Sequence, residues 1–103
     1  MLLCRVLGTV VSNHKEPATE NIKFLLTEIL DGENLKPTGN TLVAMDSVGA
    51  GIGEVVMVVQ GSSARMTETT EGKPADATIM AIVEQVEVGG QFIYEKHKEA
   101  ITN

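Results

Sequence analysis

The chain of 103 residues is long enough for one small domain, and it carries a net charge of −6 without any run of Lys or Arg. This charge argues against a surface that follows the phosphates of a nucleic acid. Hydrophobic residues make up 43% of the chain but aromatic residues only 3%, and a core of small and β-branched side chains is typical of a compact β-structure rather than a helical bundle.

A domain of this size buries only about 60–65% of the surface that its unfolded chain exposes, so it needs further stabilisation. The single cysteine, Cys4, cannot pair within the chain, which suits a reducing cytosol. Cys4, His14 and His97 are scattered and show no metal-ligand spacing, so we expect neither a structural metal nor a cofactor. Association with other copies is the remaining common stabiliser.

We expect the protein to stay in the cytoplasm. The longest wholly apolar run, residues 55–59, is far shorter than the ~20 residues that a membrane-spanning helix needs. The start of the chain, residues 2–5, resembles a lipidation box, but no basic and apolar signal region precedes it. A first strand explains these residues better.

Residues 2–11 predict that first strand, because apolar side chains occupy both faces of an alternating pattern. The polar stretch 12–21 contains Pro17 and predicts a loop. Residues 22–29 predict a second strand. A helix is the alternative there, but the short length and the flanking turns favour the strand.

A turn-rich stretch, residues 33–40, precedes a predicted third strand over 41–46. A glycine-rich turn at 47–53 then leads into a fourth strand over 54–60. The mixed polar segment 61–77 is expected to hold one short helical turn near Ser62 to Arg65.

Residues 78–88 predict a fifth strand that ends at Gly89 and Gly90, and 92–94 could add a short edge strand before the charged tail. Five short strands separated by turns predict an all-β fold, a small OB-like antiparallel barrel. We expect a single barrel domain over residues 1–88, followed by an edge segment and charged tail over 89–103.

Several predicted strands are apolar on both faces, whereas the outer face of such a barrel is normally polar. On the fourth strand, for example, Val55 and Val59 lie on one side and Val56 and Val58 on the other. Either the chain's own loops or a second subunit could cover the outer face. We favour a subunit interface.

Motifs that could carry chemistry fail on inspection. Residues 49–54 lack the glycine that a dinucleotide fingerprint needs where Glu54 stands, and a strand follows rather than a helix. Ser62 and Ser63 lack the spacing of a nucleophile elbow, because Arg65 stands where that motif has glycine, and they suit helix capping instead. Asp46 and Asp76 suit turn and cap roles. We therefore expect no catalytic residues and no enzyme.

Three segments in order resemble the EutN/CcmL family of microcompartment vertex proteins, which includes carboxysome proteins. They are residues 46–56, 61–65 and 74–79, and the first two predicted strands also resemble the family. The family usually has glycine where Asn21 stands and leucine where Phe24 stands.

The resemblance implies an OB-type barrel assembled as a tapered, cyclic homopentamer that fills the corners of an icosahedral shell. The faces of such a shell are tiled by hexameric shell proteins, which would be the other partners. It also implies that Gly49, Ala50, Gly51 and Gly53 pack tightly near the ring. Polar contacts that fix the register between subunits are expected from Asp46, Glu54, Arg65 and Asp76. The full set of predicted assembly residues is Asp46, Gly49, Ala50, Gly51, Gly53, Glu54, Gly61, Ser62, Ser63, Ala64, Arg65 and Asp76.

Two other classes of function remain open from the residues alone. A barrel of this class can bind single-stranded nucleic acid, but Phe24, Phe92 and Tyr94 are the only aromatic residues available for stacking. A small enzyme or ligand carrier could use the turn at 49–53. A gel shift at low salt and a thermal-shift screen against nucleotides and acyl-coenzymes would test these two alternatives.

Overall fold

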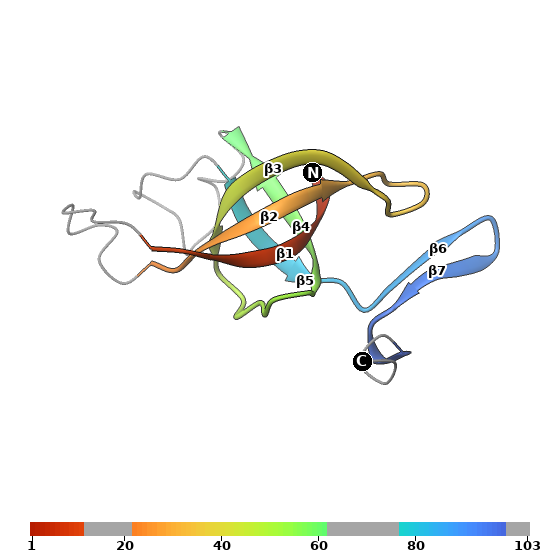
Figure 1. The fold of residues 1–103 in the computed structure, drawn as a ribbon. Coiled ribbons are helices and arrows are strands. Elements are labelled where there is room, and N and C mark those ends of the chain that lie inside the picture. Colours follow the sequence, from red (N-terminus) through yellow and green to blue (C-terminus); the bar gives the residue numbers. More distant parts are fainter. Residues whose placement is uncertain (12–21, 62–76, 99–103) are drawn as a thin grey trace.

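The computed structural model describes residues 1–11, 22–61 and 77–98, and within these ranges the chain forms a closed five-stranded barrel and a separate two-stranded hairpin (Figure 1). The barrel has the neighbour order β1-β2-β3-β5-β4 and closes through the β1–β4 pair. Its strands are β1 (Leu2–Val10), β2 (Phe24–Leu30), β3 (Pro37–Asp46), β4 (Val55–Gln60) and β5 (Ala77–Ile82). The hairpin is made of β6 (Gln85–Val88) and β7 (Gln91–Glu95). The predicted small barrel is thus confirmed.

All neighbouring barrel strands are antiparallel except β3 and β5, which run parallel. An odd number of strands cannot alternate direction all the way around a closed barrel, so one pair has to be parallel. The pair β3–β5 is short, with Met45 opposite Thr78 and Asp46 opposite Ile79. The expected antiparallel barrel therefore contains one parallel seam.

The barrel interior holds a compact core of small and β-branched side chains, as the composition indicated. The main core cluster consists of Cys4, Val6, Leu25, Ala44, Ala50, Val56, Val58, Ala77 and Ile79. The one buried polar side chain that faces this interior from β2, Thr27, donates a hydrogen bond to the Leu42 carbonyl oxygen at 2.8 Å. This bond satisfies the hydroxyl group, which would otherwise be costly to bury.

A second cluster lies on the outer side of the barrel, over β1 and β4. Its buried members are Leu30, Val55, Val83 and Tyr94, with Leu3, Leu35, Met57 and Val86 packed against them. The outer side of β4 at Val55 and Met57 is therefore covered by the chain's own C-terminal segment. Val55 and Val59 are buried within a single chain, so the subunit interface that we favoured is not needed to explain the apolar outer face of β4.

The strand expected over residues 78–88 is divided in the structure. β5 ends at Ile82, and the chain leaves the barrel at Val83 and Glu84 before β6 begins. Val83 donates its amide to the Val55 carbonyl oxygen at 2.8 Å, and its side chain enters the second cluster. The predicted edge strand at 92–94 is present as part of β7, but it pairs with β6 rather than with the barrel.

Other differences are confined to strand ends. β3 begins at Pro37, earlier than expected, and its first residues are exposed. The segment 24–30 is a strand rather than the alternative helix. Within the ranges that the structure describes, no helix is long and apolar enough to cross a membrane.

Candidate functional site

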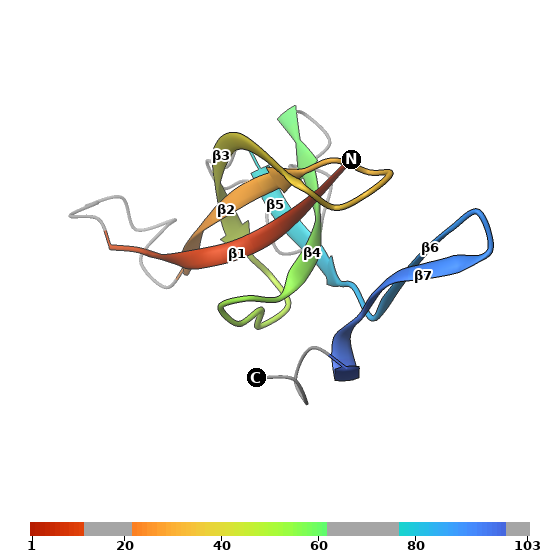
Figure 2. The same cartoon turned by 45° about the vertical axis from the view of Figure 1, so that its right-hand side comes forward.

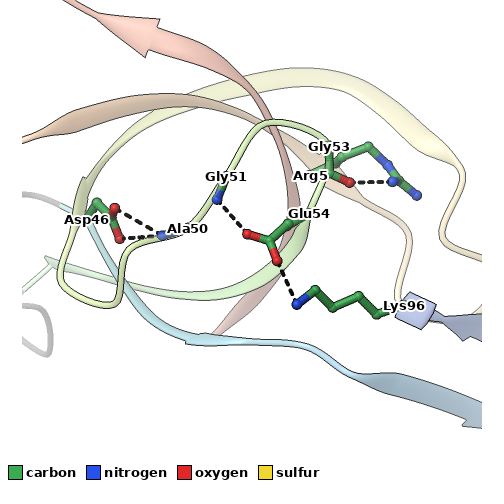
Figure 3. Close-up of polar contacts among 7 residues, drawn as sticks. All are labelled: Arg5, Asp46, Ala50, Gly51, Gly53, Glu54 and Lys96. Atoms are coloured by element: carbon green, nitrogen blue, oxygen red, sulfur yellow. Dashed lines mark hydrogen bonds and ion pairs between the residues drawn. The ribbon is translucent and has the colours of Figure 1, made fainter. Parts of the chain in front are cut away.

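The loop between β3 and β4, residues 47–54, is referred to as the glycine loop. Asp46, the last residue of β3, organises its first half. One carboxylate oxygen, Oδ1, accepts hydrogen bonds from the amides of Val48 and Gly49 at 3.0 Å, and Ala50 donates to both oxygens at 3.1–3.2 Å (Figure 3). Three consecutive amides that point to one carboxylate fix the backbone of this half.

Glu54, at the end of the loop, holds the second half. Its Oε1 accepts a hydrogen bond from the Gly51 amide at 2.5 Å, and its Oε2 lies 2.9 Å from Nζ of Lys96. These two contacts, that of Gly51 first, lower the pKa of the Glu54 carboxyl below its ordinary value. The same ion pair raises the pKa of Lys96. Because Lys96 follows β7, Glu54 joins the glycine loop to the C-terminal hairpin.

Arg5 makes a second connection between the loop and the hairpin. Its Nη1 donates a hydrogen bond to the Gly53 carbonyl oxygen at 2.7 Å (Figure 3). Its guanidinium carbon lies 5.9 Å from the ring centroid of Tyr94, within the range of a cation–π contact. Tyr94 is itself buried in the second cluster.

Two loop glycines adopt backbone conformations that side chains rarely take. The φ angles of Gly49 and Gly53 are 79° and 89°, which favours glycine because no Cβ clashes with the backbone. Gly51 has an ordinary φ, but a Cβ there would lie 3.2 Å from Oε1 of Glu54.

The sequence-predicted residues separate into two groups. Asp46, Gly49, Ala50, Gly51, Gly53 and Glu54 lie together in or beside the glycine loop. Gly61 follows β4 and is exposed with a φ of 63°. Ser62, Ser63, Ala64, Arg65 and Asp76, together with the predicted helical turn, lie outside the described residues.

Sequence reasoning missed three residues that shape this site: Arg5, Tyr94 and Lys96. Arg5 is the single cation of a predominantly apolar strand, and Tyr94 is the single tyrosine of the chain, so both could have been noted. Nothing local to Lys96 indicates a partner that lies 42 positions earlier in the chain.

The polar groups of this arrangement hold the loop in place. Each carboxylate of the loop accepts bonds from the protein's own amides or ammonium group. The described part of the chain contains no group of three or more His, Cys, Asp or Glu side chains that could hold a metal ion. Burial raises the pKa of the Cys4 thiol, a shift partly offset by its hydrogen bond with Thr27, so this thiol is a weak nucleophile.

Solved structures with the same fold define the class of protein. A structure of CcmL from Gloeobacter violaceus matches with a TM-score of 0.88 and 41% identity, covering 94% of this chain and 99% of that one. A structure described as the GrpN pentameric microcompartment shell protein from Rhodospirillum rubrum matches with a TM-score of 0.76 and 42% identity, covering 85% and 99% of the two chains. The fold is that of small-barrel microcompartment shell proteins.

The sequence comparisons identify the family. The sequence pattern of the EutN/CcmL family, described as ethanolamine utilisation protein EutN/carboxysome, matches residues 1–84. The Salmonella typhimurium (strain LT2) bacterial microcompartment shell vertex protein EutN is 38% identical over 96 residues, which cover 93% of this chain and 96% of that protein. The chain belongs to the EutN/CcmL family, and the resemblance seen in the sequence is confirmed. The nucleic-acid-binding alternative finds no support in these comparisons.

Proposed function

We propose that the protein is a non-enzymatic subunit that assembles into a homopentamer and closes the vertices of a bacterial microcompartment in the cytoplasm. The observation that carries this proposal is the family membership combined with the fold: relatives with this barrel are named as shell vertex proteins, and one with 42% identity is described as pentameric. Hexameric shell proteins, which would tile the faces, are the proposed partners.

The geometry of a shell explains why such a subunit is needed. A flat hexagonal sheet cannot close, and five-fold units supply the curvature at its corners. A cyclic ring uses a heterologous contact, in which one surface of each copy meets a different surface of the next. A subunit of this kind needs two rigid surfaces on different sides.

The glycine loop supplies one such rigid surface. Its backbone is held by Asp46, Glu54 and Arg5, all within the chain. It presents Ile52, whose side chain is 71% exposed, at the turn between the two anchored halves. These contacts already fix the loop backbone in the single chain. A contact with a neighbouring subunit would therefore cost little conformational entropy. We propose that this loop is part of the ring interface.

Native mass spectrometry of the full-length protein tests the proposal. We expect a species of five chain masses at micromolar concentration. Mixing the purified protein with a hexameric shell protein should then convert open sheets into closed particles, seen by electron microscopy. A protein that stays monomeric at tens of micromolar, or that leaves the sheets open, would contradict the proposed function.

A further inference from the structure

The hairpin carries a β-bulge that separates two of its aromatic side chains. Val86 pairs with Tyr94, but the next residue of β6, Glu87, pairs with Phe92, so Ile93 is an extra residue in β7. Paired residues share a face of the hairpin, and successive residues of β6 lie on opposite faces. Phe92 therefore lies on the face opposite to that of Tyr94.

The bulge decides where Phe92 points. In a regular strand, Phe92 and Tyr94 would share a face because they are two positions apart. Tyr94 and Val86 pack against the barrel in the second cluster, so the extra residue turns Phe92 away from its own chain, as bulges often do with a side chain. Phe92 is 53% exposed and Ile93 is 37% exposed.

The barrel of the same chain does not cover this outward face. In both views the hairpin extends away from the barrel and is attached only at its base (Figures 1 and 2). A two-stranded hairpin alone is at best marginally stable in water. An exposed aromatic and aliphatic pair on such an arm therefore needs a partner surface.

The barrel offers a matching surface on its far side. Leu26 and Val43 are paired on β2 and β3, and both point outward because their strand neighbours are buried in the core. Val43 is 46% exposed. Gly8 pairs with Leu26 on the other side, and no atom lies within 4 Å of the place where its Cβ would be. We call the surface formed by Leu26 and Val43 the β2–β3 strip, and Gly8 of the neighbouring β1 leaves its edge open.

The positions of the two surfaces also suit a contact between copies. Glu87 shares the outward face of the hairpin with Phe92. The hairpin is attached over β1 and β4, and β3 lies across the closed barrel from that pair. A head-to-tail ring requires two different surfaces on each copy, and the hairpin and the strip are two such surfaces.

We propose that Phe92 and Ile93 of one copy pack on the β2–β3 strip of the next copy in the ring. This inference rests on the proposed function, because it names a contact that would hold the pentamer together. It assigns the hairpin, which lies beyond the family match at residues 1–84, to assembly.

Cysteine cross-linking of the full-length chain tests the contact directly. A variant with both Phe92→Cys and Val43→Cys should form disulfide-linked species of up to five chains on a non-reducing gel after mild oxidation. Each single variant should give no more than dimers, because a chain with one introduced cysteine can join only one other. Cys4 is buried and would not interfere. If the double variant gives no more linked species than the single variants, the proposed contact is wrong.

The substitution Phe92→Ser provides an independent measurement. We expect it to raise the protein concentration needed for ring formation at least tenfold, with the circular dichroism spectrum of the barrel unchanged. The matched control is Gln91→Ser on the same hairpin, since Gln91 pairs with Val88 and not with Glu87, and this variant should form rings as the wild type does.

The outcomes separate this inference from the proposed function. A wild-type protein that forms no ring would overturn both. A wild-type ring that persists equally in Phe92→Ser would leave the proposed function intact and overturn the role of the hairpin. Rings that persist in Phe92→Ser but no longer close hexamer sheets would assign the outward face to the other shell protein instead of a second copy.

Discussion

Glu54 connects two parts of the molecule that are far apart in the sequence. One of its oxygens binds the Gly51 amide of the glycine loop, and the other binds the Lys96 ammonium group beyond β7. Both contacts stabilise the ionised carboxylate, which is why the pKa of Glu54 is lowered. The charge state of this one residue therefore affects the order of both the loop and the base of the hairpin.

Replacing Glu54 with Gln should change how stability depends on pH. Because the folded-state pKa lies below that of the unfolded chain, the unfolded state binds more protons in acid, and this contribution to stability is lost as the pH falls below about 4.5. We expect Glu54→Gln to be less stable than the wild type at pH 7 and to lose less stability between pH 7 and pH 3. Urea unfolding at several pH values would measure this.

The matched control for that measurement is Glu33→Gln, at an exposed carboxyl in the loop between β2 and β3. Its unfolding free energy should follow the wild-type pH dependence. An equally steep acid dependence in wild type and Glu54→Gln would show that the contacts of Glu54 do not contribute to stability.

Substitution of Gly51 should act on the same carboxylate from the other side. A side chain at this position meets Oε1 of Glu54 at 3.2 Å, so Gly51→Val should displace the carboxylate from the loop and weaken its contact with Lys96. We expect impaired ring formation in native mass spectrometry while the barrel stays folded. Gly32→Val is the control, because nothing lies within 4 Å of the added Cβ there. Normal rings of normal thermal stability in Gly51→Val would contradict this reading of the loop.

Among the structural elements, the hairpin depends most on a single side chain. Tyr94 is buried in the second cluster together with Val83 and Val55, and the Arg5 guanidinium lies over its ring. Truncation to Ala would leave a cavity and expose the outer side of β4. We expect Tyr94→Ala to lower the free energy of unfolding by about 3 kcal/mol, and to increase amide exchange in residues 85–95.

Tyr94→Phe keeps the ring and serves as the control. It should retain most of the stability and the slow exchange of the hairpin amides. Hydrogen exchange followed by mass spectrometry would measure this difference. In Tyr94→Ala we expect rapid exchange only in the hairpin, with the β1–β4 amides still protected. A Tyr94→Ala variant as stable as the wild type would show that the second cluster does not anchor the hairpin.

The sequence predicted the barrel strands because their signals are local. Alternating or continuous apolar runs bounded by turn residues locate β1, β2 and β4 to within about two residues of their observed ends. The division of residues 78–88 could not be seen this way, because Val83 is as apolar and β-branched as its neighbours. Beyond the end of β5, the Val83 side chain joins Val55 in the second cluster, a long-range contact that the local pattern does not show.

The candidate site was predicted in part for the same reason. Asp46 and the loop glycines lie within a few positions of one another, so their joint role follows from turn chemistry. The contacts of Glu54 with Lys96 and of Arg5 with Gly53 join segments more than 40 positions apart. The β1–β4 pairing brings Arg5 to Gly53, and the packing of the hairpin on the barrel brings Lys96 to Glu54. An isolated Lys or Arg in the sequence carries no sign of its partner.

For the whole molecule, the proposed role as a corner cap predicts a defect in containment rather than in chemistry. Deleting the protein from its host should leave the encapsulated enzymes fully active in lysate, because no catalyst is removed. Intact cells should form open or elongated shells that release a pathway intermediate. Comparing lysate activity with and without the protein measures this. A large loss of lysate activity, restored by the purified protein, would instead show that it takes part in the reaction.

The second cluster has a consequence for the order in which a shell is built. Since Val55 and Val59 are buried by their own chain, we expect a newly made subunit to fold before it meets a neighbour. Folding is then a first-order process, whereas ring closure depends on subunit concentration. On the proposed function, the sealing of shells is then expected to depend on the concentration of this subunit.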